Sequence, residues 1–311
     1  MNQPFPLSSR TDIALIFGQM LLCSFFWASA FLLMKLIGTD ISPWALTALR
    51  GVMGGGLLAL WVMARRQNVL PRGREWRDWL VLGILQGIIP NTLTAFALTR
   101  ISAGLTSMIQ ASTPLIVAVL AHLLFAEERL RWQRAGGVLV GFAGMAILLG
   151  PDAFLGDGAA ASGIWAMAAT AVSYAIGNLY VRSIPQPQPL RLAMGQQAFS
   201  GLPTLAAVLL VSGPAAFVAV PGQALPLVAL GLFATALPIV LYMTILRQAG
   251  PTLGSMNGYL VPIWTIGLAA IMLHEIVTGR QILGGAVVLA GLAIVSLTKR
   301  AAMPLAPKLA A

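Results

Sequence analysis

The sequence predicts an all-α integral membrane protein, with ten transmembrane helices in two inverted five-helix repeats around a central cavity. Composition is the first observation. Of 311 residues, 58% are hydrophobic and 9% charged, whereas a soluble domain carries about a quarter charged residues. The second is a series of apolar runs of roughly 20 residues, long enough for a helix to cross the hydrocarbon core. The third is self-similarity between the two halves of the chain.

The first half of the chain contains five such apolar runs with short polar links between them. We assign residues 1–150 to a first five-helix repeat, in which the first eleven residues are a loose end. No stretch between the runs is long enough for a soluble domain. The expected spans are about 13–37, 43–63, 79–98, 102–124 and 134–150.

The second half contains five more apolar runs of the same kind. We assign residues 151–311 to the second repeat, together with a short cytoplasmic tail after Lys299. The expected spans are about 162–182, 189–211, 225–247, 252–273 and 282–298.

The Lys and Arg residues indicate the orientation of the chain, because cytoplasmic loops are enriched in both. The basic residues of the links after spans two, four, six and eight fall on one side if both termini are cytoplasmic. The links after spans five and seven hold no Lys or Arg. The net charge of +10 therefore reflects topology. The basic patch with interleaved aromatics that nucleic-acid binding needs is absent, so we expect a lipid bilayer as the surroundings and no nucleic-acid partner.

The two halves repeat each other at a nearly constant offset of 148 residues. Five spans per copy is an odd number, so the second copy enters the membrane upside down. Inverted repeats are typical of carriers that alternate between inward-open and outward-open states. The matched positions include Pro90 with Pro238, Pro114 with Pro262, Glu127 with Glu275, Gly83 with Gly231 and, with one residue of slip, Lys35 with Arg182.

Several motifs together resemble the EamA family of the drug/metabolite transporter superfamily. They are "ALRGVMGGGLLAL" in span two, "QASTPL" in span four, "EERL" before span five, and a Lys or Arg that closes the first span of each half. The resemblance covers nearly the whole chain, and the YddG-type aromatic amino-acid exporters are the nearest match within the family. It implies a bacterial inner-membrane exporter of amino acids or related metabolites. One departure is Gln196 or Gln197 where Arg50 would map.

Prolines inside apolar spans are candidate kinks or hinges. A proline removes one backbone hydrogen bond, and in lipid the freed carbonyl needs another donor from protein or cavity water. A static kink that lines the cavity and a moving hinge are both compatible with the pattern. The four candidates are Pro90, Pro114, Pro238 and Pro262.

Polar and aromatic residues within the spans are candidates for lining the cavity, since polar groups in lipid tend to face the bundle interior. Arg50 either binds a substrate carboxylate with its forked donors or holds backbone carbonyls in a structural role. The other candidates are Gln86, Asn91, Gln110, Asn178, Gln196 and Asn257 as hydrogen-bonding groups, and Trp27, Phe31, Tyr174, Tyr242, Tyr259 and Trp264 as aromatic walls.

The sequence contains few residues of the kinds that form catalytic or metal sites. The chain has two histidines and one cysteine, Cys23, without the cluster of ligands that zinc requires and without a Walker loop. We therefore expect no catalytic residues, no metal and no cofactor. An oligomeric channel and an intramembrane enzyme are the alternatives of another class.

The expected substrate is a small zwitterion, with amino acids, aromatic or hydrophobic ones included, as the first choice. All nine acidic residues lie at span ends or in links, so a proton relay through the membrane centre is absent and uncoupled transport is expected. The alternative is proton coupling through His274 and Glu275. One chain is expected to suffice for transport, and the sequence leaves the oligomeric state open.

Overall fold

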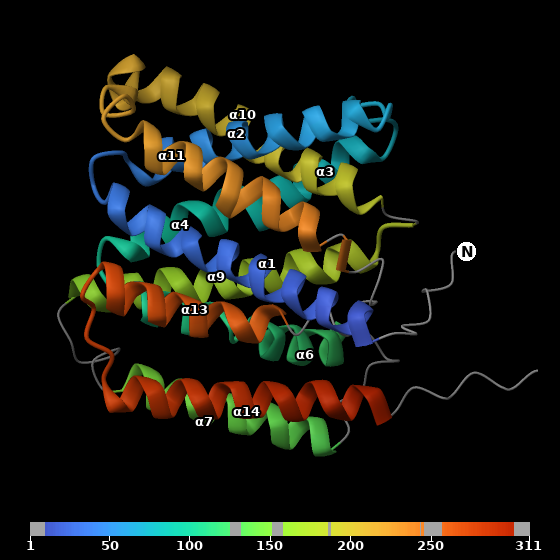
Figure 1. Ribbon diagram of the computed structural model, residues 1–311, viewed down its shortest axis with the longest axis vertical. Helices are drawn as coiled ribbons and strands as arrows, with labels where there is room; N and C mark the ends of the chain where they lie inside the picture. The colour runs from blue at the N-terminus through green and yellow to red at the C-terminus, as the bar shows by residue number, and fades with distance from the viewer. Residues whose placement is uncertain are drawn as a thin grey trace, which may run out of the picture.

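The computed structural model (Figure 1) describes residues 10–124, 132–150, 158–185, 188–242, 244–245 and 257–301. Within these ranges every regular element is a helix, as predicted. The first half contains α1 (Arg10–Ile37), α2 (Pro43–Ala64), α3 (Glu75–Gly83), the π-helical η1 (Ile84–Ile88), α4 (Ile89–Leu98), α5 (Ala103–Gln110), α6 (Thr113–Leu124) and α7 (Trp132–Leu149).

The second half follows the same order. It contains α9 (Gly158–Arg182), α10 (Pro189–Ser212), the 3-10 helix η3 (Pro214–Phe217), α11 (Ala224–Gly231), the π-helical η4 (Leu232–Ala236), α13 (Asn257–Met272) and α14 (Gly279–Ala301). Among the described residues, seven helical stretches are long and apolar enough to cross a membrane, and three shorter apolar helices accompany them. The protein is therefore a multi-pass membrane protein.

The two π-helical segments lie at corresponding places in the two halves. η1 covers residues 84–88 and η4 covers residues 232–236, so the same offset of 148 residues that relates Pro90 to Pro238 relates these segments. Each segment ends two residues before its proline. This irregularity of the backbone supports the repeat independently of residue identity.

The prolines differ in how they sit in their helices. Pro262 is inside α13 and Pro90 is in the first turn of α4. Pro114, one of the candidate kinks, lies next to an interruption of the helix in span four. Span four is broken after Gln110, and Pro114 is the second residue of α6, a position where a missing N–H costs nothing. Pro203 lies inside α10, and the sequence analysis did not single it out.

The first helices of the two halves run in opposite directions. Lys35, near the end of α1, bonds to the carbonyls of Leu98 and Ile101. Gly163, near the start of α9, packs against Ile101 as well. The end of α1 and the beginning of α9 therefore meet the same α4–α5 link (Figure 1), as an inverted repeat requires.

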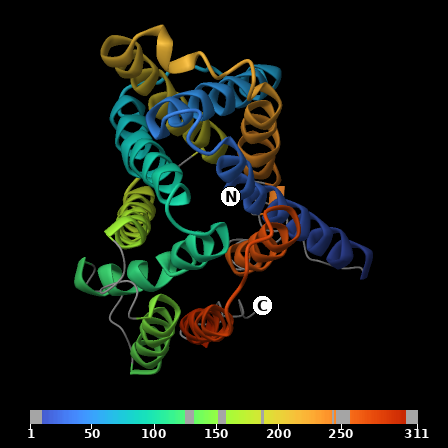
Figure 2. The same ribbon diagram turned by 90° about the vertical axis from the view of Figure 1, so that its left-hand side faces the viewer.

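Two helices pack against their own counterparts from the other half. α2 lies along α10, and α7 lies along α14 (Figure 2). Glycines allow both approaches: Gly51 faces Gly201, and Gly141 faces Gly291, with backbone nearly touching backbone. Close packing of small residues is a common way to join helices in lipid, where no hydrophobic effect drives association.

We predict that Gly51→Ala destabilises the protein, although alanine is the better helix former. A Cβ at Gly51 would lie 2.5 Å from the Cα of Gly201, and such overpacking costs about 1–3 kcal/mol. Gly56→Ala is the matched control in the same helix, because its Cβ would meet nothing within 4 Å. Thermal unfolding in detergent should show a lowered Tm for Gly51→Ala alone. Equal melting of the two variants would contradict the close contact.

Candidate functional site

Side chains of the second repeat donate to two carbonyls in the distorted segment before Pro90. The π-helical η1 and the missing N–H of Pro90 leave the carbonyls of Leu85 and Gln86 without helical donors. Ser173 donates its hydroxyl to the Leu85 carbonyl at 2.7 Å, and Gln196 donates its amide to the Gln86 carbonyl at 3.1 Å. The distortion of span three is therefore held by α9 and α10.

The carbonyl of Gln110, which Pro114 cannot serve as a donor, accepts a hydrogen bond from a neighbouring side chain. The hydroxyl of Thr113 donates to the Gln110 carbonyl at 2.7 Å, and Gln110 is the residue four before the proline. The expectation that freed carbonyls find protein donors is confirmed at Pro90 and Pro114. Gln196 thus stabilises the distorted backbone of span three, a role that its residue type alone did not predict.

We predict that Gln196→Leu destabilises the protein by about 1–3 kcal/mol, because the part-buried Gln86 carbonyl loses its donor. Pro90→Ala should offset much of this loss, since an alanine N–H can bond back to that carbonyl. A double-mutant cycle of Tm values tests the coupling. Strictly additive effects of the two substitutions would show that Gln196 does not serve the proline.

Arg50 lies half-buried in α2 and reaches across to the second π segment. Its Nε donates to the hydroxyl of Thr235 at 3.0 Å, and that hydroxyl donates to the Leu230 carbonyl at 2.8 Å, five residues back along the distorted helix. An Nη atom lies 3.7 Å from the sulfur of Met34. Arg50 thus donates to one neutral hydroxyl, that of Thr235, and to one weak acceptor, the sulfur of Met34.

No Asp or Glu pairs with Arg50 in the part of the chain that the structure describes. Tyr174 of α9 is within electrostatic range of the guanidinium. A cation in lipid is costly unless compensated, and within the described ranges no carboxylate compensates Arg50.

The interior face of α9 carries Tyr174 and Asn178. Trp165, Val172 and Ile176 are exposed on one side of this helix, and at about 100° per residue Tyr174 and Asn178 project from the opposite side. Asn178 accepts a 2.8 Å hydrogen bond from the side-chain amide of Gln86. Tyr174 therefore lies near Arg50, and the amide pair of Gln86 and Asn178 lies one helical turn further along α9.

A second group of candidates surrounds Cys23 of α1. Asn257 donates to the Cys23 sulfur at 3.0 Å, and Cys23 donates to the Pro238 carbonyl at 3.3 Å. Trp27 packs against Tyr242, with 5.2 Å between ring centroids. Asn257 is 1% exposed, and its Oδ1 has no hydrogen-bond partner among the residues that the structure describes. This group connects α1, α13 and the segment after η4.

The remaining candidates are distributed over the bundle. Phe31 lies in the largest hydrophobic cluster. Asn91 is buried and Gln110 is half-buried. Trp264 packs edge-on against Phe25 with 5.4 Å between ring centroids. The side chain of Tyr259 lies outside the described residues.

Sequence reasoning missed several residues of the site. Thr235 and Met34 contact Arg50, and both have ordinary residue types for an apolar span. Thr235 stands three residues before Pro238, and this spacing is the signal that could have revealed it. Arg50 and Thr235 are 185 positions apart, so no local pattern joins them.

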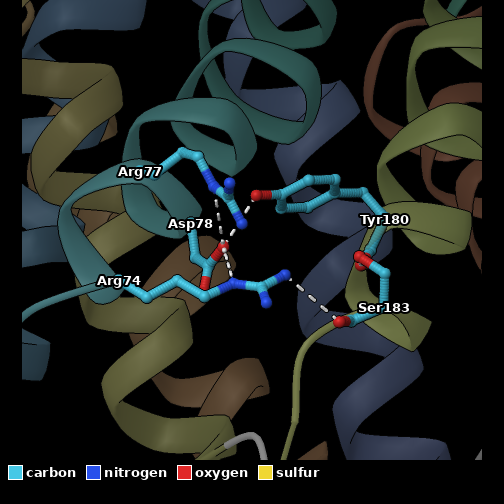
Figure 3. Close-up of polar contacts among 5 residues, drawn as sticks. All are labelled: Arg74, Arg77, Asp78, Tyr180 and Ser183. Carbon is cyan, nitrogen blue, oxygen red and sulfur yellow. Dashed lines mark hydrogen bonds and ion pairs between the residues drawn. The ribbon is translucent and has the colours of Figure 1, made fainter.

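Charged residues gather at the end predicted to be cytoplasmic (Figure 3). Asp78 is 4% exposed; it accepts a 2.7 Å hydrogen bond from Tyr180 and pairs with Arg74 at 3.5 Å and Arg77 at 3.9 Å. Arg74 also donates to the Ser183 carbonyl at 3.3 Å. The network ties α3 to the end of α9.

A recess of about 320 Å³ opens beside this network, with Arg72, Trp79 and Gln188 in its wall. Nearby, Arg191 of α10 binds Glu75 through two hydrogen bonds of 2.6 and 3.2 Å and lies over the ring of Trp79. The charges here are paired and lie at helix ends. We therefore place the candidate substrate site at Arg50 and not in this recess.

Comparisons with known proteins agree with the fold and the repeat. The EamA-like transporter family profile matches the chain twice, at residues 14–150 and 161–297. A WAT1-related chloroplastic protein of Arabidopsis thaliana is 29% identical over 88% of this chain and 67% of its own length. An uncharacterized transporter of Synechocystis is 25% identical over 93% of this chain and 92% of its own.

One relative carries a more specific description. A protein of Salmonella typhimurium described as a probable amino-acid metabolite efflux pump is 29% identical over 62% of this chain and 67% of its own length. A solved crystal structure with 21% identity superposes with a TM-score of 0.62, over 95% of this chain and all of that one, and this likeness concerns the fold. Since the family profile covers both halves, the chain belongs to the EamA-like transporter family and is a membrane transporter.

Proposed function

We propose that this transporter exports small zwitterions, amino acids with aromatic or hydrophobic side chains included, by alternating access across the bacterial inner membrane. The observation that carries the proposal is Arg50, a half-buried guanidinium that rests on Thr235 and Met34. A substrate carboxylate would complete its coordination with charge-assisted hydrogen bonds. The Salmonella relative described as an amino-acid metabolite efflux pump supports the same class.

The neighbouring groups suit the rest of a zwitterion. The amide pair of Gln86 and Asn178 and the phenol of Tyr174 offer neutral hydrogen-bonding atoms along α9. A neutral amide oxygen can accept from an ammonium group without the cost of a second buried charge. Polycations, which would need fixed acids, are expected to be poor substrates.

Purified protein in liposomes provides the test of substrate class. Radiolabelled amino acids, with phenylalanine and leucine among them, should enter proteoliposomes faster than empty liposomes. The amines that lack the carboxylate should enter both at the same rate. Uptake of the whole amino-acid panel at the rate of empty liposomes would refute the assignment.

Transport is expected to be uncoupled from protons. Asp40, Glu75, Asp78 and Glu275 lie at helix ends or in links, away from the level of Arg50, so no acidic relay crosses the bundle among the described residues. An imposed pH gradient should leave the final internal concentration equal to the external one. Uphill accumulation driven by the pH gradient would favour the proton-coupled alternative, and its loss in His274→Ala would place the coupling there.

A further inference from the structure

Lys35 joins the end of α1 to the link between α4 and α5, at the end of the bundle predicted to be extracellular. Its ammonium donates to the carbonyl of Leu98 at 2.6 Å and to that of Ile101 at 2.7 Å. Leu98 is the last residue of α4, where carbonyls have no helical donor and a cation is favourable, and Ile101 lies in the α4–α5 link. Lys35 is half-buried, so these bonds are partly shielded from water.

Glu275, in the second repeat, binds the α5 side of the same α4–α5 link. Its carboxylate accepts from the backbone N–H groups of Ala103 at 2.9 Å and Gly104 at 3.3 Å, the first residues of α5. These N–H groups have no helical acceptors, and the helix dipole favours a negative charge there. Glu275 and Lys35 also attract each other electrostatically. The α4–α5 link is thus held between two opposite charges from α1 and from the α13–α14 link.

The backbone before Glu275 is strained in the conformation that makes this contact. His274 has a φ of +53°, a left-handed conformation that is costly for a residue with a Cβ. The N–H of Glu275 bonds back to the carbonyl of Ala269 at 3.2 Å. The turn therefore folds over the end of α13 and directs the carboxylate to α5. Strain that persists at one contact is often part of a switch.

Two other polar contacts between the repeats lie at opposite ends of the bundle and are both closed in this structure. Glu75 binds Arg191 at one end, and Gln223, which stands 148 residues after Glu75, binds Asp40 at 2.6 Å at the other. Contacts that are closed simultaneously at both ends cannot be the ones that alternate. They serve as struts that hold the two repeats together.

We propose that Lys35 and Glu275 form an outer latch, a pair of charged side chains that closes the extracellular entrance by gripping the two sides of the α4–α5 link and releases it in the outward-open state. The proposal rests on alternating access as the proposed function. Lys35 and Glu275 bind main-chain atoms of the protein itself, so the latch proposal does not depend on which substrate is transported.

The test measures access to the centre of the bundle from outside. Tyr174→Cys, near Arg50 on the interior face of α9, serves as reporter in a Cys23→Ser background, and a membrane-impermeant maleimide is added to intact, oriented proteoliposomes without substrate. Glu275→Ala and Lys35→Ala should each speed labelling by about tenfold or more, since each removes two hydrogen bonds to a charged group from the closed state only. Lys35→Arg should label at the wild-type rate, because a guanidinium can also donate to both carbonyls.

Asp40→Ala is the matched control, since it breaks the strut with Gln223 at the same end and should leave the labelling rate unchanged. Monodisperse elution of each variant separates opening from unfolding, and Glu275→Gln, which keeps one acceptor, should fall between wild type and alanine. Wild-type labelling rates in both alanine variants, or equal acceleration in Asp40→Ala, would overturn the latch. If the labelling rates depend on the latch as expected but amino acids are not taken up, the substrate proposal is refuted and the latch stands.

Discussion

Replacing Arg50 with glutamine is expected to reduce transport of amino acids by about 100-fold or more, because two charge-assisted hydrogen bonds to the carboxylate are lost. Glutamine keeps a polar side chain of moderate length and can still reach Thr235. The measurement is the initial rate of uptake into proteoliposomes at several substrate concentrations. A loss of binding to the detergent-solubilised variant should accompany the loss of rate.

The matched control is Arg65→Gln, which removes an exposed arginine that lies over the ring of Trp61 at the end of α2. Its transport rate should equal that of the wild type. Arg50→Gln with wild-type affinity for amino acids would contradict the carboxylate role. A lowered Tm with unchanged substrate affinity would assign Arg50 to packing instead.

Glu75→Ala is expected to destabilise the protein by about 3 kcal/mol, because it leaves the charge of Arg191 without its partner. The Arg191 side chain is 8% exposed, so water cannot replace the two lost hydrogen bonds. Arg74→Ala is the control at the same end of the bundle. The side chain of Arg74 is 46% exposed, and its partner Asp78 keeps Tyr180 and Arg77 when Arg74 is removed, so a loss of at most about 1 kcal/mol is expected.

Thermal unfolding in detergent compares the two variants, with Glu75→Met combined with Arg191→Met as a third. The double variant should regain much of the lost stability, since it buries no charge. Equal Tm values for Glu75→Ala and Arg74→Ala would contradict the role of Glu75 as the partner of a buried charge.

The periodic features of the fold were predictable from the sequence, since lipid imposes length and polarity on every span. The apolar runs placed the helices within a few residues, and the pairing of Pro90 with Pro238 located two distorted segments. The π-helical form of those segments was not predictable, because it depends on donors elsewhere in the bundle. The break before Pro114 depends in the same way on the hydroxyl of Thr113.

The residue types of the candidate site were predictable from the sequence. The contacts between its residues were less so. Arg50 stood out because a charge inside an apolar span is rare. The partner set of Arg50 comes from α1 and η4, and Gln196 serves the Gln86 carbonyl 110 positions away. Such contacts follow from the packing of inverted halves, which a single sequence specifies only through tertiary structure. The strained His274 and the capping role of Glu275 arise in the same way.

Solute counterflow tests the central claim, alternating access by a carrier, most directly. Proteoliposomes are loaded with a high concentration of unlabelled phenylalanine or leucine and diluted into a trace of the labelled amino acid, without ion gradients. A carrier returns labelled substrate inward in exchange for unlabelled substrate moving out, so labelled substrate should rise transiently above equilibrium and then decay. A monotonic approach to equilibrium, with no overshoot, would show a channel and contradict the account.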